Sequence, residues 1–354
     1  MGTKTAELPT SQKNSRTRGL RVVAIGGGTG LSTLLKGLKR FVLSPTELLS
    51  APSDALVISN LSAVVTVSDD GGSSGRLRKE LNMLPPGDIR NCIVALSEDE
   101  ALLSKLFRHR FDKGSGLEGH SFGNLFLAAL TSLTSDFSEA VRLSSEILLT
   151  RGHIYPATTS NIELEARMED GTTVRGETKI TASSGRIREL FLVPPDVGPM
   201  PQTLEAIAHA DLITIGPGSL FTSLIPNLLV RGISRAIVES PATKVYICNL
   251  MTQANESLGL TAADHIRALQ RHAQKNFFDF ALINRTPVSN EMKAKYALEG
   301  ACQIVSDLEA IEDLGVIPVL GDYLEEDGVA RHNTSRVARD LMQLAAQQPR
   351  SERN

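Results

Sequence analysis

The chain has 354 residues, of which 41% are hydrophobic, so it can bury the core of one large α/β domain or of a domain with an insertion. Aromatic residues make up only 4%, tryptophan is absent and the formal net charge is −3, which together argue against a nucleic-acid-binding surface. The three cysteines form no C-x-x-C pair, and no apolar run approaches the ~20 residues that span a bilayer. The sequence therefore predicts a cytoplasmic protein without a disulfide scaffold, a zinc ribbon or a membrane partner.

Short runs rich in Val and Ile alternate with helical patterns along most of the chain. Most of these runs are continuously apolar, as is typical of parallel strands that helices cover on both faces. Helical spacing is clearest over residues 120–133 and 261–272. The strands predicted in this way are residues 21–25, 63–68, 211–215, 244–249, 278–284, 303–306 and 316–320.

One segment departs from this rhythm. Residues 162–168 alternate strictly between apolar and charged side chains, turn at Asp170-Gly171 and continue as "TTVRGETKI", which predicts an antiparallel hairpin. Residues 186–192 could add a third strand. We predict one Rossmann-like α/β domain over 20–345, a three-layer, doubly wound and mostly parallel sheet, with an antiparallel insertion at about 160–193. Residues 1–19 are expected to be a disordered tail, and 346–354 a frayed one.

The first strand runs directly into the glycine-rich turn "IGGGTGL". Glycines let a ligand approach the backbone, and the helix that follows offers unpaired N–H groups, so the turn can hold phosphate. A tight turn without a ligand explains this single feature equally well. Dinucleotide binding of the NAD type is disfavoured, because Leu31 stands where G-x-G-x-x-G needs its third glycine and no acid follows about 20 residues later.

Two more turns of similar composition follow predicted strands. "SDDGGSSG" places Asp69 and Asp70 at a strand end, where carboxylates could hold Mg²⁺, accept a proton or bind sugar hydroxyls, and where Asp70 could alternatively cap the next helix. "IGPGSL" resembles a phosphate loop, with Ser219 also able to cap a helix. Three such turns at one sheet edge predict a single ligand crevice.

Several other polar residues fit either a structural or a ligand-binding role. Asp88 is predicted as a helix N-cap, and Arg90 either as a solvated side chain or as part of the site. Asn249, Thr252 and Gln253 follow a buried strand and suit either loop hydrogen bonds or a base or sugar edge. Zinc-protease, α/β-hydrolase and P-loop motifs are all missing from the sequence.

These blocks together resemble the YvcK/CofD-like family, and its YvcK branch most closely. The blocks are "GGGTGLSTLLKGLK", "AVVTVSDDGGSSGRLR", "PPGDIRN", "HSFGNL", "GPGSLFTSLIPNLLV" and "MTQ" followed by "TAADH", and the resemblance extends from residue 21 to about 337. The YvcK branch implies a Rossmann-like regulator that binds UDP-sugars such as UDP-N-acetylglucosamine without turnover. It implies links to gluconeogenic carbon metabolism, peptidoglycan precursor supply and cell shape.

The CofD branch implies the alternative function, a metal-dependent 2-phospho-L-lactate transferase that acts on a deazaflavin. Asp69 and Asp70 would then lie by Mg²⁺ and the attacking hydroxyl; otherwise no cofactor is required. A metabolic enzyme as protein partner and a homo-oligomeric state are both open. Phosphorylation of Thr334 beside Arg331 or Arg336 is a further hypothesis, against the simpler reading of Thr334 as a helix cap.

The resemblance implies one nucleotide site over the three turns. The loop "ANES" at 254–257 keeps an acid, Glu256, but lacks a glycine expected there, which leaves the ligand selectivity of this loop open. The predicted nucleotide- and phosphate-binding residues are Gly26, Gly27, Gly28, Thr29, Gly30, Asp69, Asp70, Gly71, Gly72, Ser73, Ser74, Asn91, Asn124, Gly216, Pro217, Gly218, Ser219, Asn249, Thr252 and Gln253.

Overall fold

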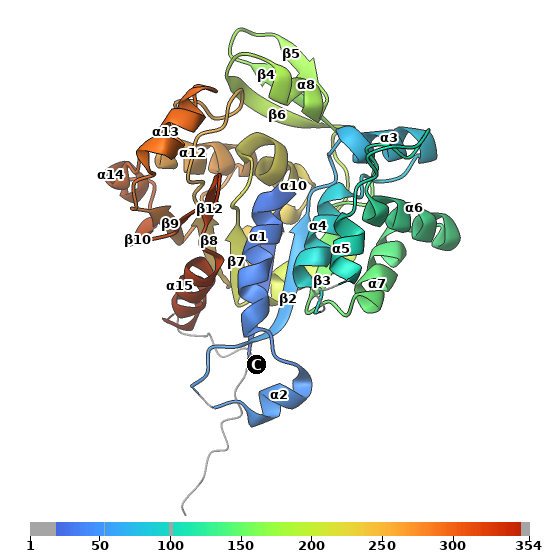
Figure 1. The fold of residues 1–354 in the computed structure, drawn as a ribbon. Coiled ribbons are helices and arrows are strands. Elements are labelled where there is room, and N and C mark those ends of the chain that lie inside the picture. Colours follow the sequence, from blue (N-terminus) through green and yellow to red (C-terminus); the bar gives the residue numbers. More distant parts are fainter. Residues whose placement is uncertain (1–18, 53, 99–101, 348–354) are drawn as a thin grey trace, which may run out of the picture.

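A parallel sheet forms the centre of the protein (Figure 1). The structure, a computed structural model, describes residues 19–52, 54–98 and 102–347. Within these residues the sheet has seven strands, all paired in parallel, in the order β10-β9-β8-β7-β1-β2-β3. The strands are β1 (Leu20–Gly26), β2 (Ile58–Val65), β3 (His153–Pro156), β7 (Leu212–Ile215), β8 (Thr243–Ile247), β9 (Phe280–Asn284) and β10 (Ile317–Gly321).

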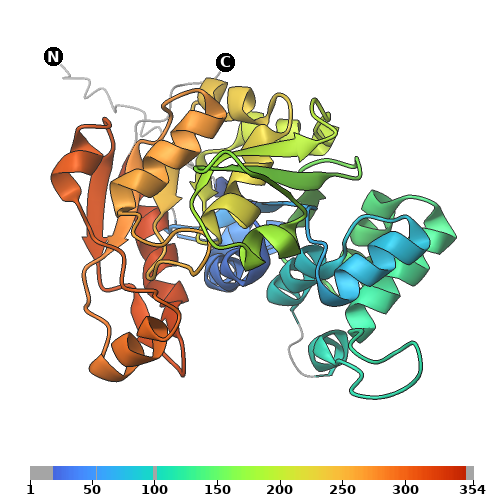
Figure 2. The same cartoon turned by 90° about the horizontal axis from the view of Figure 1, so that it is seen from above.

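Helices cover both faces of this sheet, which gives the predicted three layers. On one face α1 (Gly28–Leu38) packs between α4 (Gly87–Leu96) and α15 (Thr334–Gln347). The other face is covered by α9 (Pro201–His209), α10 (Ile225–Leu229), α11 (Ile233–Glu239) and α12 (Ala262–Ala273). Figure 2 shows the molecule from above, with helices on both sides of the sheet. Because both faces are covered, β7 is buried at every position, as its continuous apolar sequence predicts.

Other short elements complete the chain around these layers. They are η1 (Lys39–Phe41), α2 (Pro45–Ser50), α3 (Gly72–Leu81), α5 (Leu103–Arg108), α6 (Phe122–Thr134), α7 (Phe137–Ile147), the π-helical η2 (Leu220–Leu224), α13 (Asn290–Ala297), α14 (Leu308–Glu312), and the hairpin strands β11 (Leu324–Glu326) and β12 (Ala330–His332).

The chain order reverses at the middle of the sheet. From β1 the chain proceeds through β2 to β3 on one side, and β7, β8, β9 and β10 follow on the other. In doubly wound sheets, ligands bind outside the carboxyl ends of the strands at such a reversal. Here those ends are the ends of β1 and β7, each directly before a predicted glycine-rich turn.

A small antiparallel sheet lies above this edge of the central sheet (Figure 1). Its strands are β4 (Glu163–Met168), β5 (Thr173–Arg175) and β6 (Ile187–Val193), in the order β5-β4-β6. The predicted hairpin and its third strand are therefore confirmed. The second half of "TTVRGETKI" is not strand but helix α8 (Glu177–Ala182), which begins after Gly176 at φ +99°.

The sequence prediction was wrong at two strands. Residues 303–306 are not a sheet strand, since Gln303 makes only an isolated bridge to Met251 and its side chain bonds the backbone of Thr286 and Val288. The edge strand β3 was missed, because His-Ile-Tyr-Pro carries no Val/Ile run. β2 also begins five residues before its predicted start, in the mostly polar stretch "ISNLS".

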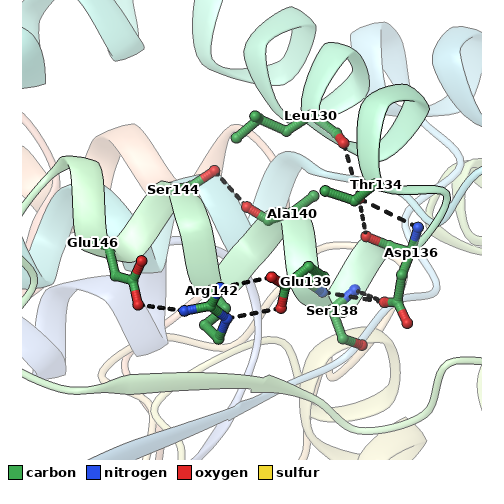
Figure 3. Close-up of polar contacts among 9 residues, drawn as sticks. All are labelled: Leu130, Thr134, Asp136, Ser138, Glu139, Ala140, Arg142, Ser144 and Glu146. Atoms are coloured by element: carbon green, nitrogen blue, oxygen red, sulfur yellow. Dashed lines mark hydrogen bonds and ion pairs between the residues drawn. The ribbon is translucent and has the colours of Figure 1, made fainter.

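The connection between α6 and α7 shows local capping at the edge of the fold (Figure 3). Asp136 Oδ1 accepts the N–H groups of Ser138 and Glu139 at 2.7 and 3.1 Å, and Thr134 Oγ1 donates to the carbonyl of Asp136 at 2.8 Å. Arg142 pairs with two exposed glutamates of α7. These contacts cap α7 and support its exposed face, and α7 itself packs beside β3 at the edge of the sheet.

Both predicted tails lie mostly outside the described residues. Gly19 belongs to the folded domain, because it is buried and accepts a hydrogen bond from Ser59 Oγ at 2.9 Å. At the other end α15 continues through Gln347, two residues into the segment expected to fray. None of the helices in the described part of the chain is long and apolar enough to cross a membrane.

Candidate functional site

The first and third glycine-rich turns meet at the reversal point of the sheet. A Cβ atom on Gly30 would lie 2.3 Å from the carbonyl oxygen of Pro217, so only glycine permits this approach of the two backbones. Leu31, at the position of the missing third glycine, is fully buried in the core. The first turn is therefore shaped to meet a second loop, which a dinucleotide fingerprint does not require.

A cavity of about 610 Å³ opens at this meeting point. Its wall also includes parts of α1, α4, the loop after β8 and the segment around β12. The predicted residues that line it are Gly27, Gly28, Thr29, Gly30, Asn91, Pro217, Gly218, Ser219, Asn249 and Gln253. The predicted residues outside its wall are Gly26, Asp69, Asp70, Gly71, Gly72, Ser73, Ser74, Asn124, Gly216 and Thr252.

The charge of the cavity wall was not anticipated from the sequence. Lys36, Arg108 and Arg331 line it, from α1, the end of α5 and β12, whereas no Asp or Glu among the described residues does. His332 is also in the wall, where burial lowers its pKa to about 4 and its Nε2 lies 3.0 Å from the carbonyl of Cys248. The cavity is therefore cationic, with a neutral imidazole at its side.

Hydrogen bonds fix the floor of the cavity. Asn249 accepts the N–H of Gly218 at 3.1 Å and donates to its carbonyl at 2.7 Å, so both ends of the amide hold the third turn. Ser219 does not cap the helix that follows; its Oγ donates to Gln253 Oε1 at 2.8 Å. The N–H groups of that helix are instead accepted by Glu256, which sequence reasoning did not assign to this role.

Comparison with known proteins identifies the family. A family model described as 2-phospho-L-lactate transferase CofD matches residues 22–324. The chain belongs to the CofD family. Within this family it is 50% identical over 324 residues to the gluconeogenesis factor of Halalkalibacterium halodurans, covering 91% of this chain and 95% of that protein. It is 47% identical over 326 residues to the gluconeogenesis factor of Bacillus subtilis, covering 92% and 98%.

Solved structures agree with this membership of the CofD family. A crystal structure of a Bacillus halodurans protein superposes with a TM-score of 0.86 at 48% identity, and covers 92% of this chain and 100% of that one. A second, described as a member of the UPF0052 family, superposes at 0.85 with 47% identity. The family and the fold predicted from the sequence motifs are both confirmed.

The second glycine-rich turn of this CofD-family chain lies outside the cavity wall. Asp70 Oδ1 accepts from the backbone N–H of Thr178 at 2.8 Å and from its hydroxyl, so Asp70 ties the turn to α8 and does not cap α3. Ser73 Oγ bonds His120 Nδ1 at 2.8 Å and accepts from Asn124 Nδ2 at 3.1 Å, all three side chains being buried. This turn is held by protein contacts on both sides.

Carboxyl groups gather beneath this turn. Asp88 is not the N-cap of α4, which is Pro86; its carboxylate accepts the backbone N–H of Gly28, and burial raises its pKa to about 6. Glu177 accepts from Ser68 Oγ at 3.0 Å, and burial followed by the charge of Asp69 raises its pKa well above the usual range. Sequence reasoning missed Glu177, because nothing local marks a helix residue of the insertion as part of this edge.

These carboxyl groups do not make a prepared metal site. Asp69 Oδ1 accepts the N–H of Gly71 at 2.9 Å, and Asp70 is used by Thr178. In the part of the chain that the structure describes, no three His, Cys, Asp or Glu side chains are arranged to hold a metal ion. Mg²⁺ binding by Asp69 and Asp70 stays a prediction.

Two other predicted residues lie near the cavity without lining it directly. Arg90 is partly buried and donates to Asn91 Oδ1 at 2.8 Å, so it positions a wall residue. Thr334 is the first residue of α15 and packs against Gly37 of α1, while Asn333 supplies the cap by accepting the N–H of Arg336 at 3.0 Å. Phosphorylation of Thr334 stays a prediction.

Proposed function

We propose that the crevice binds a nucleoside-diphosphate sugar of the UDP-N-acetylglucosamine type, and that the chain acts as a regulatory protein without turnover. The observation that carries this proposal is the cavity wall, which combines the glycine-rich start of α1 and the third glycine-rich turn with Lys36, Arg108 and Arg331 and has no carboxylate among the described residues. Helix N-termini and cations both favour bound phosphate, and a diphosphate spans more than one of them.

The size and remaining polarity of the crevice support the same ligand class. A volume of about 610 Å³ falls within the roughly 300–1,000 Å³ typical of small-molecule sites. Gln253 and Tyr296 also line the crevice and offer an amide and an aromatic ring to a base or a sugar. The diphosphate would lie against the turns, with the nucleoside and the sugar on either side.

The regulatory role is supported by the relatives that share most of their length with this chain. They are named gluconeogenesis factors, so we propose a role in gluconeogenic carbon metabolism, with effects on peptidoglycan precursor supply and cell shape. A regulator without turnover acts through another protein, and we propose a cytoplasmic metabolic enzyme as that partner. Co-purification of such an enzyme only when the UDP-sugar is present would support this part.

The transferase function is the competing proposal. It is supported by the description of the family model and by the carboxyl groups of Asp69, Asp88 and Glu177 near the first turn. An acid in that position could assist a hydroxyl nucleophile. Against it stands the cavity wall itself, in which the described residues supply cations but no base of the carboxylate type.

Calorimetric titration tests both proposals with one set of ligands. UDP-N-acetylglucosamine, UDP-glucose, UDP, GDP, NAD and a deazaflavin are each titrated with and without Mg²⁺. We expect saturable binding of the UDP-sugars that does not depend on Mg²⁺. If no UDP-sugar binds, the regulator proposal fails; Mg²⁺-dependent binding of the deazaflavin, with product formed from activated phospholactate, would establish the transferase.

The substitution Arg331→Gln tests whether the UDP-sugar binds in the crevice. Because a hydrogen bond to a charged group contributes about 1.5–3 kcal/mol, UDP-sugar affinity should fall by roughly tenfold to a hundredfold. The matched control is Arg235→Gln on α11, where the arginine is exposed and pairs with Glu239. Equal affinities in the two variants would mean that the ligand binds elsewhere.

A further inference from the structure

A second hollow lies between the small antiparallel sheet and α12. Its volume is about 240 Å³, below the roughly 300–1,000 Å³ of most small-molecule sites, so it suits a ligand smaller than a nucleotide. The beginning of β6, the loop 258–260 and one face of α12 line it, together with Phe221 of η2. None of its wall residues is shared with the crevice described above.

Arginines dominate the polar wall of this hollow. Arg186, Arg188, Arg267 and Arg271 all line it. Arg267 pairs with Asp264 at 2.8 Å, whereas Arg186, Arg188 and Arg271 have no ion pair with a carboxylate in the described part of the chain. Arg271 instead donates weakly to the carbonyl of Arg188 at 3.4 Å. Three guanidinium groups around one hollow favour an anion, and their planar forks match carboxylate and phosphate oxygens.

A buried acid supplies the second, independent observation. Glu256 also lines the hollow and is only 5% exposed. Its Oε1 accepts the N–H groups of Phe221 and Thr222 at 2.7 and 2.9 Å, whereas its Oε2 is buried and makes no hydrogen bond within 3.5 Å among the described residues, although the hydroxyls of Thr222 and Ser219 also interact with this carboxyl. An unpaired buried oxygen costs stability, so a group from outside the chain is expected to satisfy it.

The other polar side chains of the wall do not meet this need. His272 has both ring nitrogens occupied, since Nε2 accepts the N–H of Leu190 at 3.0 Å and Nδ1 lies 2.7 Å from the carbonyl of Ala268. The other two acids of the wall are Glu169, which is exposed, and Asp264, which pairs with Arg267. A hydroxyl group suits Oε2 best, because it can donate to a carboxylate or accept from a carboxylic acid.

We propose that this hollow binds a small hydroxylated organic acid. Its carboxylate or phosphate group lies against Arg186, Arg188 and Arg271, and its hydroxyl bonds Glu256 Oε2. The apolar floor of Phe221 and Ala268 accommodates the carbon frame. The site is distinct from the nucleotide crevice and takes a different class of ligand.

One loop connects the hollow with the crevice. The carbonyl of Gln253 accepts the N–H groups of Glu256 and Ser257 at 3.2 and 3.0 Å, and the side chain of Gln253 accepts from Ser219 in the crevice wall. Glu256 also holds the first turn of η2, which follows Ser219 directly. An occupant that bonds Glu256 would therefore contact the same segment that carries the third glycine-rich turn of the crevice, a link to the nucleotide site that rests on the proposed function.

Direct titration with defined acids tests the site itself. The probes are L-malate and citrate for the carboxylate arm, 3-phosphoglycerate for the phosphate arm, and inorganic phosphate for the ion alone. We expect one molecule of at least one hydroxy acid to bind per chain with Kd below about 1 mM, and inorganic phosphate to bind about tenfold more weakly. Failure of all the organic acids to saturate the protein by about 10 mM overturns the proposal.

Variants locate the binding and separate it from the crevice. Arg186→Gln and Arg271→Gln should each weaken the acid about tenfold, and Arg235→Gln should bind it like the wild-type protein. Equal binding by all three variants would also overturn the proposal. Arg331→Gln, in the crevice, should leave the acid affinity unchanged. If the acid binds but no UDP-sugar does, the proposed acid site is supported and the proposed nucleotide function fails.

Discussion

Replacing Gly30 with alanine tests how closely the two glycine-rich turns meet. The added Cβ would lie 2.3 Å from the carbonyl oxygen of Pro217, 2.7 Å from its carbon and 3.0 Å from Cα of Gly218. All three are backbone atoms, so no side chain can rotate away and the turns must separate. Overpacking of this kind costs about 1–3 kcal/mol.

Helix propensity favours alanine at this position and so opposes the clash. The sign of the measured change in the free energy of unfolding therefore shows which of the two effects is larger. Gly30 is the third residue of α1, where alanine in an open helix would gain about 1 kcal/mol over glycine. Because the clash is with backbone, we expect it to prevail and to lower the free energy of unfolding by up to about 2 kcal/mol. Separation of the turns should also weaken UDP-N-acetylglucosamine about tenfold or more.

Urea unfolding followed by circular dichroism, together with calorimetric titration, measures both effects. Gly198→Ala is the matched control, since the only atom near its added Cβ is Nη2 of Arg231 at 3.9 Å. That variant should be as stable as the wild-type protein or slightly more stable. If Gly30→Ala is also as stable as wild type and binds the ligand equally well, the close contact of the two turns does not hold the crevice.

Three further substitutions test the surroundings of the crevice. Asp88 has a pKa of about 6 against an ordinary 3.8, so its contribution to stability is largest below about pH 4 and is lost as the pH rises through 6. Between pH 5 and 7.5 this loss is about 1.5 kcal/mol out of a total of about 3, and Asp88→Asn, which can still accept from Gly28, should remove it when urea unfolding is compared at these two pH values. Thr178→Val removes the hydroxyl bond to Asp70 and should lower the free energy of unfolding by about 1 kcal/mol; an unchanged value would mean that this bond adds nothing to the attachment of α8. Arg142→Gln should stay within about 0.5 kcal/mol of wild type in the same assay, because its ion pairs are exposed, and a larger loss would contradict that reasoning.

Local patterns in the sequence predicted most of the architecture. Continuous apolar runs indicated six of the central strands, and the alternation before Asp170-Gly171 indicated the antiparallel insertion. The same patterns failed where a strand lacked Val and Ile, as in β3, and where an apolar-looking stretch was held by side-chain hydrogen bonds, as at Gln303. Both failures come from contacts with distant residues, which a local pattern does not contain.

By itself the sequence determined the family, the α/β class and two of the glycine-rich turns around the crevice, because glycine and serine mark backbone shapes that are local. Only the tertiary structure decided that the Asp70 turn faces α8, that Arg108 and Arg331 join Lys36 across the cavity, and that Glu256 holds η2. These residues are far apart in the chain and come together only through the order of the strands. Charge and burial at a site depend on such packing, so they could not be predicted from spacing alone.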